Sequence, residues 1–288
     1  MIGPGSIGRT RMADGAMGTA LIARGLPPAR PPEHWVLERP AEVARVHAAH
    51  VAAGAEVVLT CTFNAARLDV AARGLAVEDV ARRAVLLARA ARPRAVAGCT
   101  GATGLAAPGA SQAGDGELEE RHGAAFRALA GAGVDLLWTE THLSHREARA
   151  ALRAGRRTGL PVVVTVHARQ TPAGPAALDG TPALELLVAL WRDGAAAVGL
   201  NCVEPDAALA RLVARLSTRV PVPIVVKPNA GLPGRSVGPW AFAAGVGLAV
   251  RAGASVVGGC CGSGDAHLRA LARGAVPARA RAAGQARG

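Results

Sequence analysis

Two adjacent cysteines near the C-terminus are the strongest sign of chemistry in this sequence. Cys260 and Cys261 follow a short apolar run and lie between glycines in residues 256–262. Neighbouring side chains of a regular strand point to opposite faces, so both thiols can serve one site only where the strand ends irregularly, as glycine permits. Cys202 closes the run 199–202 and supplies a third thiol. Three thiolates and one replaceable ligand describe Zn²⁺ with an open position, so we predict a catalytic zinc site on these cysteines.

Zinc held by three thiolates is electron-rich and suits a fourth thiolate better than it suits the generation of hydroxide. A free thiol has a pKa of about 8.5 and is mostly protonated at neutral pH. Coordination removes that proton and keeps the sulfur nucleophilic. The predicted site therefore favours a thiol substrate that attacks an electrophilic carbon.

Two carboxylates at predicted strand ends could recognise such a substrate. Asp14 and Glu140 could each bind the ammonium group of an amino-acid thiol. Backbone N–H groups of the glycine-rich turn 15–18, which includes Gly15 and Met17, could bind its carboxylate. The alternative for Glu140 is a cap on the helix that begins near Ser144.

The other cysteines and the histidines near strand ends carry weaker signals. Cys61 and Cys99 each stand alone, and a packing role is expected for them. His142, His145 and His167 also follow strand segments, but exposed or simply packed histidines are common.

The charge balance does not indicate a nucleic-acid partner. The net charge is +12, but Lys227 is the only lysine, the arginines are spread along the chain, and tyrosine is absent. Because lysine and asparagine are so rare in this chain, the few that occur are candidates for functional positions. Lys227 and the three asparagines, Asn64, Asn201 and Asn229, all lie at or just after apolar runs.

Cysteine usage and hydropathy point to a reducing compartment. Five cysteines, two of them adjacent, argue against a disulfide framework. Residues 1–14 lack the apolar core of a secretory signal, and no apolar run has the length of a membrane helix. We therefore expect a cytoplasmic protein without membrane contact.

Eight short, mostly apolar segments alternate with amphipathic stretches along the chain. The predicted strands are 11–18, 56–63, 95–100, 135–140, 161–167, 196–202, 223–229 and 254–261. The predicted helices are 40–53, 77–91, 118–132, 144–154, 182–192, 206–216, 239–252 and 265–271. Several end at a glycine that precedes the next strand.

This alternation predicts an α/β fold, a single-domain (β/α)₈ TIM barrel spanning residues 1–288 with a frayed tail at 277–288. A doubly wound open sheet is the alternative, but a glycine-rich nucleotide-binding turn is missing. The polar residues fall at the carboxyl ends of the strands, where barrel enzymes keep their active sites. The long loops 101–116 and 168–180 could be lids or solvated connections.

Six short motifs resemble those of the homocysteine S-methyltransferase family, in the family's order and across residues 12–271. They are residues 14–19 (DGAMGT), 60–63 (TCTF), 140–141 (ET), 199–202 (GLNC), 227–231 (KPNAG) and 258–262 (GGCCG). The resemblance implies a (β/α)₈ barrel, zinc on Cys202, Cys260 and Cys261, and homocysteine as methyl acceptor. It also implies that Asp14 and Glu140 lie beside the homocysteine amino group and backbone. Asn229 is expected near the metal.

The methyl donor is less defined by the resemblance. Relatives use S-methylmethionine or S-adenosylmethionine, betaine, or methylcobalamin on a corrinoid module. Residues 39–43 and 227–233 look most like the homocysteine module of cobalamin-dependent methionine synthase. Cys61 replaces a frequent asparagine, and 262–267 (GSGDAH) departs from the usual GTTPEH. Neither departure touches the cysteine ligands, and the resemblance therefore leaves the surroundings of the metal and the donor pocket undefined.

The expected function is zinc-dependent methyl transfer to homocysteine, which forms methionine, with small molecules as substrates. Two alternatives remain open at this stage. One is a non-catalytic protein that binds zinc or homocysteine. The other is the homocysteine-activating subunit of a split cobalamin-dependent methionine synthase, with a corrinoid protein as candidate partner.

Overall fold

A computed structural model describes residues 10–67, 74–105, 113–232 and 235–274 of the 288-residue chain. The expected frayed tail at 277–288 lies outside these residues. Eight parallel strands form one sheet in the order β1-β10-β7-β6-β5-β4-β3-β2. They are β1 (Arg11–Met12), β2 (Val57–Leu59), β3 (Ala95–Thr100), β4 (Leu136–His142), β5 (Val162–Val166), β6 (Ala197–Asn201), β7 (Ile224–Lys227) and β10 (Val256–Val257).

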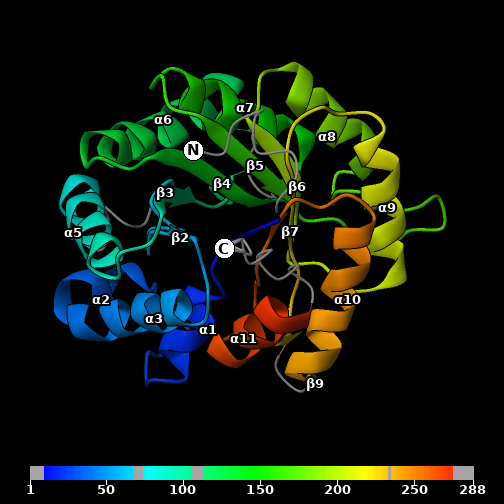
Figure 1. Ribbon diagram of the computed structural model, residues 1–288. Coiled ribbons are helices and arrows are strands. Elements are labelled where there is room, and N and C mark those ends of the chain that lie inside the picture. The colour runs from blue at the N-terminus through cyan, green and yellow to red at the C-terminus, as the bar shows by residue number, and fades with distance from the viewer. Residues whose placement is uncertain (1–9, 68–73, 106–112, 233–234, 275–288) are drawn as a thin grey trace, which may run out of the picture.

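The sheet curls into a nearly closed barrel that helices surround, as Figure 1 shows. An isolated parallel bridge between Ala13 and Val57 joins its two edges. The helices are α1 (Met17–Ile22), α2 (Glu33–Glu38), α3 (Pro40–Ala52), α5 (Val77–Ala90), α6 (Asp115–Gly131), α7 (His145–Arg156), α8 (Ala183–Arg192), α9 (Ala207–Ser217), α10 (Pro239–Arg251) and α11 (Asp265–Gly274). The predicted (β/α)₈ barrel is confirmed. None of the described helices is long and apolar enough to cross a membrane.

Strand side chains alternate between the barrel interior and the layer under the helices. In β2, Val57 and Leu59 belong to the interior cluster, and Val58 packs in the layer under the helices. Trp138 of β4 is fully buried in the interior. Burial on both faces explains why these strands read as continuous apolar runs.

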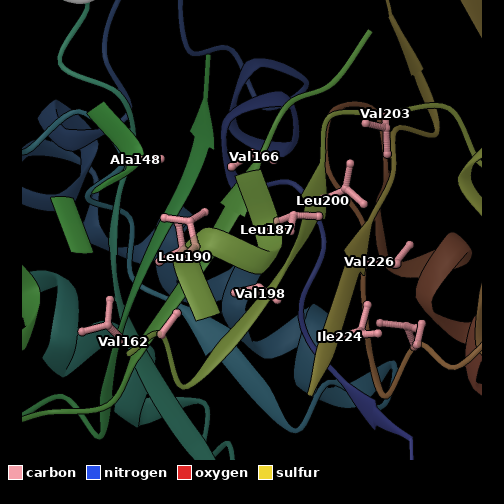
Figure 2. Close-up of a cluster of buried hydrophobic side chains, with 14 of the residues drawn as sticks. Ala148, Val162, Val166, Leu187, Leu190, Val198, Leu200, Val203, Ile224 and Val226 are labelled. Atoms are coloured by element: carbon pink, nitrogen blue, oxygen red, sulfur yellow. The ribbon is translucent and has the colours of Figure 1, made fainter. Parts of the chain in front are cut away.

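Branched aliphatic side chains of the strands and of α8 pack together under the helices, as Figure 2 shows, and α7 contributes mainly small residues such as Ala148. Val162, Val198 and Leu190 meet there, and each is almost fully buried. Burying a side chain of this size contributes about 1.5–3 kcal/mol. This packing fixes the strands whose carboxyl ends carry the polar residues.

The predicted glycine ends of the helices are confirmed. Gly54 after α3 and Gly253 after α10 have φ of 111° and 116°, a conformation that costs glycine little. After α5, the same role falls to Arg92, at φ 56°.

The sequence prediction was wrong in detail at the N-terminus. The first strand is only Arg11–Met12, not 11–18, because the chain turns at Gly15 and enters α1 at Met17. The short helices α1 and α2 were not predicted. Each is only six residues long, too short for a helical repeat of apolar residues to stand out in the sequence. A small hairpin, β8 (Gly231–Leu232) with β9 (Arg235–Ser236), was also missed.

Candidate active site

The three predicted cysteines meet at the carboxyl end of the barrel. Cys202 follows β6, and Cys260 and Cys261 follow β10. The Sγ of Cys202 lies 2.8 Å from that of Cys260 and 3.8 Å from that of Cys261. All three sulfurs lie within 4.8 Å of one another, and none is in a disulfide.

The backbone around the cysteines takes conformations that aim the three thiols together. Cys202 has φ 53°, which is uncommon for a residue with a side chain and is typical of functional sites. Gly262 has φ 78°, and a Cβ there would lie 2.6 Å from the carbonyl oxygen of Gly231. Glycine is therefore required where the chain turns after the cysteine pair.

The donor set fits Zn²⁺. Zinc–sulfur bonds of about 2.3 Å in a tetrahedron place sulfurs about 3.7 Å apart. The Cys202–Cys261 spacing of 3.8 Å agrees with this, and the Cys202–Cys260 pair needs to open by about 1 Å. Hydrogen bonds from Cys202 and Cys260 lower the pKa of Cys261, while contacts within the cluster raise the pKa of Cys202, so the thiolate is favoured at Cys261 alone. Asn229, expected near the metal, is buried with its Oδ1 unpaired among the described atoms.

Asp14 lies at the site, but other groups already bind its carboxylate. Its Oδ1 accepts a hydrogen bond from Lys227 Nζ at 2.9 Å, and its Oδ2 accepts from the backbone N–H of Leu59 at 2.7 Å. Burial alone would lower the pKa of Lys227, but Asp14 and Glu140 outweigh it and raise that pKa. Lys227 also lies over the ring of Trp138, at 5.3 Å from the centroid. The retained lysine is thus the cation of a buried ion pair.

Unlike Asp14, Glu140 has a carboxylate oxygen that, within the described part of the chain, is free to accept a hydrogen bond from a ligand. Its Oε1 accepts from Cys99 Sγ at 3.5 Å, and its Oε2 is buried without a hydrogen bond among the described residues, 3.9 Å from Lys227 Nζ. Burial raises the pKa of Glu140 to about 7, although Lys227 opposes the shift. An incoming ammonium group would restore the charged form. Glu140 does not cap α7, because Ser144 accepts the hydrogen bond from the Glu147 N–H there.

Asn201 and Thr141 are site residues that sequence reasoning did not assign. Asn201 Oδ1 accepts from the Thr141 N–H at 2.9 Å, and its Nδ2 donates to Thr141 Oγ1 at 2.6 Å. The same Nδ2 lies 3.7 Å from Cys260 Sγ. Thr141 has φ 63°. The Asn201 amide therefore connects the end of β4 to the cysteine cluster. One sign of this role was visible in the sequence, because Asn201 is one of only three asparagines in the chain.

A cavity of about 410 Å³ opens beside the thiols. Asp14, Gly15, Met17 and Glu140 line it, as do all three cysteines. Its wall also includes Cys61, Cys99, Glu33, Phe63, Asn64 and Lys227. Of the turn's N–H groups, that of Ala16 already donates to the Ser263 carbonyl oxygen at 3.1 Å.

Asn229 lines a neighbouring cavity of about 230 Å³ instead, and Cys202 borders both. His167, one of the weaker candidates, also lines the smaller cavity and binds the Cys202 carbonyl oxygen at 2.9 Å through Nδ1. His142 and His145 line neither cavity.

Known proteins resemble this chain over almost its whole described length. The family model for homocysteine S-methyltransferase matches residues 11–275. The metallated form of the Escherichia coli homocysteine methyltransferase MmuM aligns with a TM-score of 0.79 and 27% identity, covering 92% of this chain and 96% of that one. The Bacillus subtilis homocysteine S-methyltransferase YbgG is 30% identical over 90% of this chain and 92% of its own.

A Mycobacterium tuberculosis methionine synthase is 29% identical over 92% of this chain, which spans only 24% of that protein. The resemblance inferred from the motifs is therefore confirmed by the family model, the curated relatives and the solved structures. The chain belongs to the homocysteine S-methyltransferase family and is a methyltransferase built on a (β/α)₈ barrel.

Proposed function

We propose that this protein is a zinc-dependent enzyme that transfers a methyl group to the thiolate of L-homocysteine and forms methionine. The observation that carries the proposal is the convergence of Cys202, Cys260 and Cys261 on one wall of the cavity that Glu140 also lines. Five free thiols in the chain are in keeping with a cytoplasmic enzyme.

In this proposal the three cysteines hold the metal, and other residues of the chain hold the substrate. Zinc bound there would supply the positive centre that keeps a substrate thiol deprotonated. Glu140 binds the substrate ammonium group, and Asp14 holds Lys227 beside it. Gly15 and Met17 shape the cavity around the substrate backbone, and Asn229 lies on the far side of Cys202.

The donor carries a positively activated methyl group. The homocysteine sulfur forms a bond to the methyl carbon while the bond from that carbon to the donor breaks, and the donor leaves with the electron pair. With S-methylmethionine or S-adenosylmethionine the leaving group is a neutral thioether. The 410 Å³ cavity suits small substrates of this size.

A second candidate is the homocysteine-activating subunit of a cobalamin-dependent system. The likeness to about a quarter of a methionine synthase favours it. In that case a corrinoid protein is the partner and methylcobalamin is the donor.

Zinc analysis followed by a methionine-formation assay across donors tests the proposal. We expect zinc on the purified enzyme and turnover with at least one donor. Cys260→Ala should lose both metal and turnover, whereas the control Cys61→Ala should keep its zinc. Full turnover by metal-free enzyme would refute zinc dependence. Turnover only with added methylcobalamin or a corrinoid protein would select the second candidate, and homocysteine binding without transfer from any donor would show a non-catalytic protein.

A further inference from the structure

A second group of metal-ligating side chains lies outside the cysteine site. His122 of α6, His142 at the end of β4 and Glu147 of α7 each offer a ligand atom within 4.8 Å of the others. All three side chains are buried. The family's motifs do not include them, and neither cavity beside the thiols contains them.

Two histidine nitrogens of this group lack partners. Nδ1 of His122 and Nδ1 of His142 are buried without a hydrogen bond among the described residues, whereas Nε2 of His122 faces Glu147 Oε1 at 3.5 Å. A buried polar atom left in this state costs about 1–3 kcal/mol. Two such atoms beside one carboxylate point to a missing ligand with positive charge.

The neighbouring threonines orient the group as ligands of a metal are usually oriented. His142 Nε2 lies 2.5 Å from Thr139 Oγ1, which also accepts from Thr100 Oγ1 at 3.2 Å. If Nε2 donates to Thr139, the lone pair of His142 Nδ1 is left for a metal. Thr103 donates both its N–H and its Oγ1–H to Glu147 Oε1, each at 2.6 Å, which fixes the carboxylate.

We propose that His122, His142 and Glu147 form a second, buried site for a divalent transition metal such as Zn²⁺. Two neutral imidazoles and one carboxylate are a ligand set that zinc accepts. Ligands about 2.0–2.1 Å from a tetrahedral zinc lie about 3.3 Å apart. His122 Nε2 and Glu147 Oε1 face each other at 3.5 Å. Because Oε1 already accepts two hydrogen bonds from Thr103, the second oxygen of Glu147 is the one that we assign to the metal.

An ion at this site would hold the segment that presents Glu140 to the cavity. The pairing of β4 with β5 shifts register between Thr139 and His142, and Glu140 and Thr141 lie within that shift. Linking His142 to α6 and α7 would fix the backbone on the far side of Thr141. All three ligands are buried and line neither cavity, so a substrate could not reach the ion. A buried water would fill the fourth position, and the metal would be structural, supporting the end of β4 that carries Glu140.

Metal analysis and ¹¹³Cd NMR of the intact protein test this assignment. We expect two metal equivalents per chain. After cadmium exchange, we expect one strongly deshielded resonance from thiolate ligands and a second in the range of nitrogen and oxygen ligands. A single equivalent with only the thiolate resonance would overturn the proposal, and this wild-type measurement needs no variant that must fold.

Variants assign the two resonances. His142→Ala should lose the nitrogen and oxygen resonance and one metal equivalent, while the control His145→Ala on α7 keeps both. Cys260→Ala should lose the thiolate resonance alone, so failure of the zinc-methyltransfer proposal is distinguishable from failure of this one. Retention of both resonances in His142→Ala would also overturn the assignment.

Discussion

At the scale of single residues, the site is built on a buried charge cluster as much as on the cysteines. Asp14 and Lys227 form an ion pair whose side chains are 2% and 3% exposed. Glu140 lies on the other side of the lysine. The cation is shared by two carboxylates, so removing it leaves buried negative charge with no compensation.

Lys227→Met should therefore lower the free energy of unfolding by about 3–5 kcal/mol, the usual cost of breaking a buried pair. Asp14→Asn alone should also destabilise, but the double variant should lose less than the sum of the two. Urea denaturation of the three variants measures this. Additive losses would show that the two side chains do not act as a pair.

Glu140→Gln should weaken homocysteine binding rather than metal binding. The amide keeps the shape of the side chain but loses the charge that pairs with an ammonium group, so KM for homocysteine should rise about tenfold or more, as expected for a charge-assisted hydrogen bond. Steady-state kinetics with zinc analysis checks this. An unchanged KM would remove Glu140 from the proposed ammonium site.

Residue types and spacing were enough to predict the cysteine cluster, because three thiols at strand ends have few other uses. The partner of Asp14 was not predictable from them. Lys227 was visible as an isolated lysine, but it stands 213 residues from Asp14 in the sequence, and only the folded barrel brings its Nζ within 2.9 Å of that carboxylate. The hydrogen bonds between Asn201 and Thr141 depend on the irregular end of β4 and join residues 60 positions apart, so they could not be predicted from the sequence either.

At the scale of elements, the helix ends show how closely the sequence encodes the barrel. Gly54, Gly133, Gly194 and Gly253 each follow a helix by two residues and adopt positive φ. Arg92 takes the corresponding place after α5 with φ 56°. A left-handed conformation costs a residue with a Cβ roughly 1–2 kcal/mol.

Arg92→Gly should consequently raise the free energy of unfolding by about 1 kcal/mol, because it relieves that cost at an exposed position. Gly133→Ala is the matched reverse change, since a Cβ there meets no atom within 4 Å, and it should destabilise by a similar amount. Urea denaturation measures both. Equal stability of Arg92→Gly and the wild type would contradict the argument.

The eight strands and the eight longer helices could be predicted because apolar strand segments alternate regularly with amphipathic stretches, several of which end at a glycine. The short helices α1 and α2 could not be predicted, since six residues are too few to show a helical repeat and packing defines them. Leu21 and Trp35, for example, are held in one apolar cluster with Val43 and Val46 of α3. Tertiary contacts of this kind leave no local pattern.

At the scale of the whole molecule, buried neutral histidines link folding to pH. His47 of α3 is fully buried and neither ring nitrogen has a partner among the described residues. Burial lowers the pKa of His47 to about 4. The unfolded chain, with a histidine pKa near 6.5, therefore binds more protons than the folded chain between these values.

Stability should accordingly fall as the pH is lowered from about 6.5 to 4, and His47 should account for about 3 kcal/mol of the total. His47→Leu should remove that share and give a shallower dependence, whatever its stability at neutral pH. Urea denaturation at a series of pH values compares the two slopes. Parallel curves for the two proteins would exclude His47 as a source.

The meeting of the first and second strands has a consequence for the motions of the barrel. β1 and β2 are joined by an isolated bridge between Ala13 and Val57 in place of a continuous ladder. Just beyond this bridge, the Asp14 carboxylate accepts a hydrogen bond from the backbone N–H of Leu59. This contact between β1 and β2 should open first in local fluctuations of the barrel. Backbone amides of β1 and β2 should therefore exchange hydrogen faster than those of the other strands. Asp14 and Leu59 also line the cavity beside the cysteines. A ligand that contacts both residues would hold β1 and β2 together, so its binding should slow hydrogen exchange in both strands.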